Sequence, residues 1–378
     1  MRRNYFYAIA TLAGTIVGGG LFAAPLVVSK AGILPFLVYL PFLALVQFFL
    51  HMIYAEIILS SKQRHRMPGY VGLYRGARAK KWTLLFSILG KHGALLAYIL
   101  LGGSFLYGLL GPILGGNLFI YTTILFLIES LIVLFGLRLI AGVELALSAL
   151  LVALIFLIGF KSSIHFDWDK FILFNRDHIF LPYGPVFFAV GGQAAIPEVC
   201  RLLRAQKNKI KSAIAWGTFI PALLMLFFVV VVVGITGDHT TAEALIGLKR
   251  YFHDGVITFS LIFGLLTVIT SFLVISQSLR EVYWWDLNIN NNLSWFLACG
   301  IPFLLYLVGI SNLTKVIGLT GSVVGGIFGI ILILLLFRVK KDRKQTPAVT
   351  NKLSVPVAVF LCSLFVLGLA YELWYFFN

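Results

Sequence analysis

Long apolar runs separated by short polar or basic loops follow one another along almost the whole chain. A helix that crosses a bilayer needs about 20 mostly apolar residues, and each run is close to that length. The pattern therefore predicts an all-α integral membrane protein with eleven transmembrane helices. They are expected at residues 5–28, 33–60, 88–112, 117–136, 139–160, 181–200, 212–236, 255–279, 293–310, 315–338 and 354–377.

The polar stretches between these runs are too short to fold into a soluble domain. The longest are residues 61–81, 161–180 and 237–254, so residues 1–378 are predicted to form a single transmembrane domain. In the last stretch, Thr240 followed by Glu243 has the spacing of a capping box. This spacing predicts a short helix from Thr240, which would serve as a lid or cover the outer face.

Composition and the placement of charge give the orientation. The chain is 60% hydrophobic and 12% charged, too apolar for a water-soluble protein. With a cytoplasmic N-terminus, 22 of the 30 Lys and Arg residues fall in cytoplasmic loops, which satisfies the positive-inside rule. The net charge of +16 then orients the protein in the plasma membrane, with Asn378 external, and predicts no nucleic-acid partner. Seven basic residues fall outside: Lys30, Lys161, Lys170, Arg176, Lys249, Arg250 and Lys315.

The remaining polar residues exclude several functions. Acidic residues gather in the two long external loops, at Asp167, Asp169, Asp177, Asp238, Glu243 and Asp254. The three cysteines, Cys200, Cys299 and Cys362, lie in or beside apolar spans, so no disulfide framework is expected. The sequence contains no His-rich metal motif, no GxSxG and no phosphate-binding loop. We therefore expect neither an enzyme nor a resident cofactor.

Two spans carry residues that interrupt a helix in mid-membrane. Span 1 contains Gly18, Gly19 and Gly20 followed by Pro25, and span 6 contains Gly191, Gly192 and Gln193 followed by Pro197. Each Gly costs a helix about 1 kcal/mol and Pro about 3 kcal/mol relative to Ala. Backbone groups freed in this way must face protein, a cavity or a ligand. Close packing of straight helices is the alternative use of such glycines.

The interruptions stand in the first and sixth spans, at corresponding positions of two halves. This arrangement is typical of inverted-repeat transporters and predicts two five-helix repeats, at about 5–160 and about 181–338, plus an extra helix at about 354–377. Half-helix ends present partial positive charge to an anion and free carbonyls to a cation. A zwitterionic amino acid is therefore the expected substrate.

The stretches GTIVGGGLFAAP, PVFFAVGGQAAIPEV, VITSFLVISQSL and PFLLYLVGISNLTKVIGLTGSVVGG give the chain a family resemblance. It resembles the amino acid–polyamine–organocation superfamily, in its aromatic and hydroxy amino-acid permease and amino-acid/auxin permease branch. The resemblance implies a leucine-transporter-like fold. It also implies substrate contacts at Thr15, Ile16, Gly18, Gly19, Gly20, Phe188, Ala189, Gly191 and Gln193, with Phe187 or Phe188 as an aromatic lid.

Two positions extend this candidate site. Tyr98, near the middle of span 3, is a candidate to bind the substrate carboxylate, and interhelical packing is its equally weighted alternative. Many members of the resembled family have His where Gln193 stands.

Span 8 places three hydroxyls on one helical face, because Thr267, Thr270 and Ser271 are spaced i, i+3 and i+4. The resemblance pairs Thr270 and Ser271 with the carbonyls of Gly14 and Val17 as an oxygen site for Na⁺. In the alternative reading, the hydroxyls bond to carbonyls of their own helix.

Proton coupling is the rival, and ionisable residues inside the spans are its candidates. Glu129 lies near the middle of span 4 without an evident partner. Glu56, Glu144 and Glu198 stand near cytoplasmic ends and are expected in structural or gating ion pairs. His51 and His92 are weaker candidates, expected as packing residues.

These observations predict a secondary transporter that imports a neutral amino acid, with aromatic and hydroxylated side chains as the named candidates. Na⁺ is preferred over H⁺ as the coupling ion, and a monomer or weak oligomer is expected. A channel would need a filter signature that the sequence lacks. A membrane sensor that binds the same amino acid without transporting it is the alternative.

Overall fold

The computed structural model describes residues 2–61, 65–135, 140–161, 165–252, 255–342 and 347–377. All regular secondary structure in these ranges is helical, which confirms the predicted all-α class. The α-helices are α1 (Arg2–Ile16), α2 (Gly20–Ala31), α3 (Ile33–Ser60), α4 (Met67–Arg75), α5 (Ala77–Leu114), α6 (Leu118–Phe135), α7 (Ile140–Lys161), α8 (Tyr183–Ala189), α9 (Ile196–Leu202), α10 (Ile210–Thr236), α11 (Leu245–Leu248), α12 (Gly255–Glu281), α13 (Asn291–Leu307), α14 (Leu313–Gly321), α15 (Phe328–Asp342) and α16 (Val355–Phe377).

Seven helices in the described ranges are long and apolar enough to cross a membrane, or eight if α1 and α2 form one bent span. Two shorter apolar helices lie at Val152–Lys161 and Asn291–Leu307. The predicted sixth span is divided into α8 and α9, each of 7 residues. By length and composition the structure thus supports a multispanning protein, and the number eleven stays a prediction.

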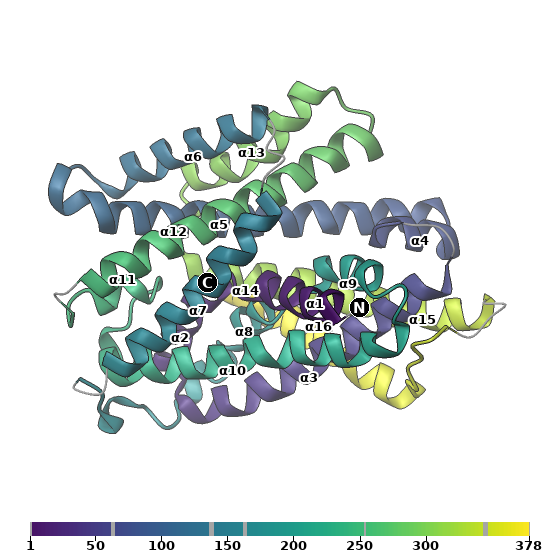
Figure 1. Cartoon of the computed structure of the whole chain (residues 1–378), viewed down its shortest axis with the longest axis horizontal. Coiled ribbons are helices and arrows are strands. Elements are labelled where there is room, and N and C mark those ends of the chain that lie inside the picture. The colour runs from purple at the N-terminus through teal and green to yellow at the C-terminus, as the bar shows by residue number, and fades with distance from the viewer. Residues whose placement is uncertain are drawn as a thin grey trace.

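The helices form two neighbouring groups (Figure 1). In this view α5, α6, α12 and α13 lie on one side of the molecule, whereas α1, α3, α8, α10 and α16 lie on the other. The contacts agree, because α5 packs on α6 and α12, and α1 packs on α10. The interrupted helices therefore lie inside one group, with α5 crossing beside them.

Large apolar side chains are exposed on the peripheral helices. Phe135 of α6 and Phe160 of α7 are each 82% exposed, and Leu367 of α16 is 69% exposed. Such surfaces are unfavourable in water and match the hydrocarbon of a bilayer. These exposed apolar side chains therefore form a surface suited to the lipid contact expected from the composition.

The predicted external loop at residues 165–180 packs over the junction of α2 and α3. Gly32 joins these helices with φ +97°, a conformation that favours glycine, and an added Cβ would lie 2.7 Å from the carbonyl oxygen of Leu173. The amides of Ile33 and Leu34 bond to the carbonyls of Ile172 and Leu173, at 2.9 and 3.1 Å. The loop thus closes this end of the helix group.

The predicted cytoplasmic segments gather at the opposite end (Figure 1), where α4 and the end of α15 lie close together. Arg75 of α4 donates to the carbonyl of Leu334 at 2.7 Å. Arg138 and Asp254, which the charge pattern assigned to the inside and outside, lie outside the described residues. Which end faces the cytoplasm stays a prediction.

Candidate functional site

The first apolar segment bends by 52° between α1 and α2. The amide of Gly18 bonds to the Ile16 carbonyl at 2.9 Å, and the amide of Leu21 bonds to the Gly18 carbonyl at 3.1 Å. In a continuous helix these two amides would bond to Gly14 and Val17. The bend therefore withdraws the usual i+4 partners from both carbonyls. These are the two carbonyls that the family resemblance implies as cation ligands.

The second interruption separates α8 from α9 at residues 190–195. The amide of Gly191 turns back to the Phe188 carbonyl at 3.1 Å, and a 3₁₀ turn at Gln193–Ala195 precedes α9. The α9 helix then begins with Pro197 in its first turn, where a missing N–H costs no intrahelical bond. Glycine and proline residues thus lie at the second interruption.

The two interruptions lie against each other. A Cβ added to Gly20 would lie 2.7 Å from the Ala189 Cα and 2.9 Å from a ring carbon of Phe188. A Cβ added to Gly192 would lie 2.8 Å from a side-chain carbon of Ile16. The approach at Gly20 is to backbone and leaves no room for a larger residue, whereas at Gly192 the near atoms belong to side chains that would have to shift. The contact joins segments about 170 residues apart in the sequence.

Tyr98 of α5 completes this group. Its ring carbon would lie 2.8 Å from a Cβ added to Gly19, and its side chain is buried. Gly18 differs from its neighbours, because an added Cβ there would meet only the Thr15 carbonyl oxygen, at 4.0 Å. Open space therefore adjoins Gly18, beside residues that the sequence assigned to substrate.

The other predicted substrate contacts have varied surroundings. Phe188 is half-buried and Ala189 is buried. Thr15 is exposed, and its hydroxyl donates to the Thr11 carbonyl at 2.8 Å. Gly191 is half-buried, and the position of an added Cβ would lie 3.5 Å from the side-chain oxygen of Gln193. These placements bring the residues together without testing their roles.

Helix α3 supplies polar partners that the sequence reasoning missed. The side-chain amide of Gln193 donates to Gln47 at 2.5 Å, and Gln47 donates to the buried carbonyl of Phe187 at 3.2 Å. One turn further on, His51 accepts the Gly192 amide at Nε2, at 3.1 Å. Because Nε2 accepts, the ring proton lies on Nδ1 and is donated to the Thr218 hydroxyl, 3.0 Å away. The spacing of Gln47 and His51 on one face of an apolar helix was the available signal.

On α12, two of the three predicted cation-ligating hydroxyls bond within the helix. Thr267 donates to the Phe263 carbonyl at 2.8 Å and Thr270 donates to the Thr267 carbonyl at 2.9 Å. Such bonds use the hydroxyl hydrogen and leave oxygen lone pairs for a cation. Ser271 is half-buried on the same face. Assembly of these groups with Gly14 and Val17 stays a prediction.

The ionisable residues divide into three cases. Glu198 forms the expected ion pair, with Arg201. Glu56 accepts both the backbone and side-chain amides of Asn351, at 2.6 and 2.9 Å. Glu129 is buried, and neither of its oxygens has a hydrogen-bond partner in the described part of the chain. The side chain of Glu144 lies outside the described residues.

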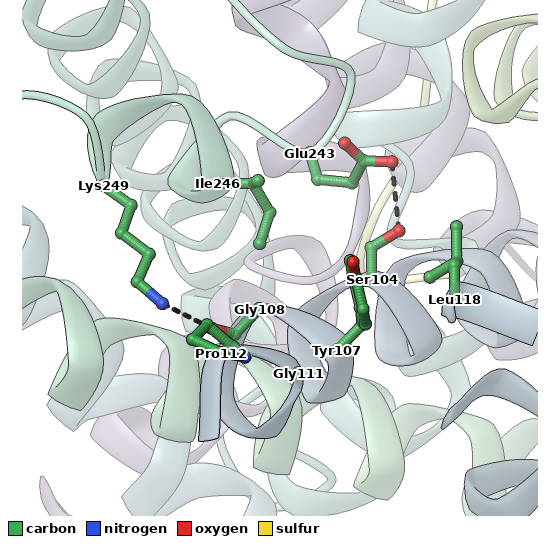
Figure 2. Close-up of a pocket in the computed structure, with 9 residues that line it drawn as sticks. All are labelled: Ser104, Tyr107, Gly108, Gly111, Pro112, Leu118, Glu243, Ile246 and Lys249. Atoms are coloured by element: carbon green, nitrogen blue, oxygen red, sulfur yellow. Dashed lines mark hydrogen bonds between the residues drawn. The ribbon is translucent and has the colours of Figure 1, made fainter. Parts of the chain in front are cut away.

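The second external loop has a different structure from the predicted capping box. The helix there begins at Leu245, and Thr240 donates to the Gly237 carbonyl at 2.6 Å. Glu243 accepts the Ser104 hydroxyl of α5, at 3.1 Å, as Figure 2 shows. The prediction was wrong because a tertiary hydrogen bond replaced the local one.

This loop borders a cavity of about 420 Å³ at the end of α5 (Figure 2). Lys249 extends along its other side and donates to the Gly108 carbonyl at 2.6 Å. Burial raises the pKa of Glu243, against the opposing effect of its hydrogen bonds. The side chains of Glu243 and Lys249 thus fasten the loop to α5, as a lid or cover would require.

Comparison with known proteins identifies the relatives of this arrangement. The model of the tryptophan/tyrosine permease family matches residues 1–374, which confirms the resemblance. A crystal structure of MhsT in complex with L-phenylalanine is similar with a TM-score of 0.64 and 17% identity, covering 99% of this chain and 97% of that one. An Eremococcus coleocola manganese transporter, crystallised with an aromatic bis-isothiourea substituted compound, has a TM-score of 0.64 and 13% identity, with coverage of 99% and 87%. No curated protein matches the sequence.

Proposed function

We propose that this chain, which belongs to the tryptophan/tyrosine permease family, is a secondary transporter. It imports a neutral aromatic amino acid by alternating access. The family match over residues 1–374 carries the proposal. The fold is consistent with it, since one structural neighbour is a manganese transporter and another, MhsT, was crystallised with L-phenylalanine.

The interrupted helices supply groups suited to the zwitterionic end of the substrate. The amides at the start of α2, at Gly19 and Gly20, lie where a helix leaves its first N–H groups without intrahelical partners. They would bind the carboxylate, and carbonyls at the end of α1 would bind the ammonium group. The ring would lie toward Tyr98 and Phe188, beside the space at Gly18.

The remaining features of the proposal follow the sequence pattern. The protein has eleven spans, arranged as two inverted repeats of five plus α16, with α1–α2 and α8–α9 as the broken spans. The N-terminus is cytoplasmic and the C-terminus external in the plasma membrane, as the basic loops require. The working unit is a monomer or weak oligomer.

Na⁺ is the proposed coupling ion. The carbonyls of Gly14 and Val17 are released by the bend, and the hydroxyl of Thr270 on α12 keeps lone pairs for a cation. Ser271 follows it on the same helix. Oxygen donors of this kind suit a hard cation. Glu129 provides the rival, a proton-linked carboxyl in mid-span.

Uptake of labelled tryptophan, tyrosine and phenylalanine into proteoliposomes tests transport, with Na⁺ and pH gradients imposed separately. Thr270→Val should raise the Na⁺ concentration needed for half-maximal uptake. The matched control Thr83→Val removes another buried hydroxyl bonded within its helix, at 2.9 Å to Ala79, and should not. Full uptake without Na⁺, unchanged by Thr270→Val, would exclude the Na⁺ site. Binding without any flux would identify a sensor instead.

A further inference from the structure

Glu372 is a buried carboxyl that the proposed transport site does not use. It lies near the end of α16, outside the two repeats, and is only 1% exposed. One carboxyl oxygen accepts the backbone amide of Gly184 in α8, at 3.0 Å. In the described part of the chain, Lys and Arg side chains form no ion pair with it. A carboxylate is thus enclosed with a single amide donor.

Glycines from two other helices make room for this carboxyl. Cβ atoms added to Gly184 of α8 or Gly318 of α14 would collide with the carboxyl oxygens of Glu372. The three helices therefore meet at the carboxyl group itself. Any separation of α8 or α14 from α16 would open this junction to the solvent.

The two partners of α16 adjoin irregular backbone. The α8 helix ends at the break before Gly191, whereas α14 passes into a π-helical turn at Ser322–Ile327 within one span, Leu313–Asp342. The break allows α8 to move relative to α9, and π-helical turns are frequent at functional sites. Close contact between Gly321 and the Gly184 carbonyl couples α14 to α8. The carboxyl of Glu372 therefore lies at a junction that outer-gate movement would open or close.

Four tyrosines and one lysine are the other titratable side chains near this junction. Tyr183 of α8 and Tyr39 of α3 pack against each other, 6.5 Å between ring centroids, and Tyr371 and Tyr375 flank Glu372 on α16. Tyrosines titrate near pH 10 in water. Lys315 of α14 donates to the Phe376 carbonyl at 3.3 Å, and its ammonium lies over the Tyr375 ring. Glu372 is the carboxylic acid among these groups.

We propose that Glu372 is a proton-binding site that holds α8 and α14 against α16 when it is neutral and releases them when it is ionised. This inference rests on the proposed transport function and adds external protons as a regulator of the outer gate. Enclosing an unpaired carboxylate costs far more than enclosing the neutral acid. The ionised form is better hydrated with the junction open, so a rise in external pH favours opening.

Distances between spin labels on both sides of the junction test the proposal in the full-length protein in lipid nanodiscs. The labels replace exposed Asp177, before α8, and Leu373 of α16, after the three native cysteines are removed. Linkage to one proton changes the ratio of open to closed populations by at most about tenfold per pH unit. Between about pH 5 and about pH 8, the long-distance population should rise in the parent.

Glu372→Gln keeps the acceptor for Gly184 but cannot ionise, so it should show the short distance throughout. The control Asp238→Asn removes an external carboxylate whose side chain is 83% exposed, and should retain the parental response. A parent without a pH response, or a Gln variant with the parental response, overturns the proposal. If the Gln variant does not insert, Glu372→Asp should shift the midpoint, and an unchanged midpoint overturns it equally. Uptake measured on the same preparations reports separately on transport.

Discussion

The contact between the two interruptions gives the sharpest test of the site. Gly20→Ala adds one methyl group where the backbone of Ala189 lies 2.7 Å away and the Phe188 ring 2.9 Å away. Real Cβ atoms do not approach backbone so closely, so α2 and α8 must separate. Overpacking of this kind costs about 1–3 kcal/mol. If the closed, substrate-bound arrangement needs this contact, affinity should fall by about 5- to 150-fold.

Equilibrium binding of labelled tryptophan to purified protein measures the loss, and thermal unfolding on the same samples reports stability. Gly18→Ala is the informative comparison, because its methyl group would enter open space. It should weaken binding with little change in unfolding temperature if ligand occupies that space. Gly300→Ala in α13 is the matched control, with only ordinary contacts to Phe296 at 3.4–3.5 Å. It should bind normally. Tryptophan affinity within about twofold of the parent in both Gly20→Ala and Gly18→Ala would refute the proposed location.

Three further predictions concern other parts of the molecule. Gln47→Leu leaves the Phe187 carbonyl and the Gln193 amide without their partner. The free energy of unfolding, measured thermally or chemically, should therefore fall by about 1–3 kcal/mol. An unchanged stability would mean that water replaces Gln47. Glu243→Gln should stabilise the protein at high pH, because burial raises the pKa of Glu243 and its ionised form opposes docking. This gain should vanish as pH falls and the native carboxyl becomes neutral, and melts that differ equally at every pH would contradict it. A cysteine replacing Arg75 should react only with reagents that enter the cell, and labelling by an impermeant reagent would reverse the topology.

The sequence could predict the helical class and the positions of both interruptions, because these depend on local properties. A run of about 20 apolar residues needs a bilayer, and consecutive glycines weaken a helix wherever they occur. It also placed Gly19, Gly20, Phe188 and Ala189 in one candidate site, and they do lie together. The grouping of residues from both interruptions into one site came from the family resemblance, since spacing alone does not show which interruptions lie in contact.

The missed features are tertiary. Gln47 and His51 share one face of an apolar helix, but only the fold shows that Gln47 bridges Phe187 and Gln193. Glu243 had the spacing of a capping residue, but Ser104 of α5 binds it instead. Local patterns cannot rank such partners, because the competing donors lie far away in the sequence. Glu372 was missed for the same reason, as its surroundings come from α8 and α14.

The two interruptions differ in how many of their backbone groups have hydrogen-bond partners. In an apolar setting each freed backbone group requires a partner, and α3 supplies partners to the second interruption through Gln47 and His51. The first interruption is different, because the i+4 amides of Gly14 and Val17 bond elsewhere. A satisfied interruption can stay open between transport cycles, whereas one with free carbonyls gains stability when a cation or an ammonium group binds. Under the proposed function, the asymmetry predicts that ligand binding stabilises the α1–α2 bend more than the α8–α9 bend.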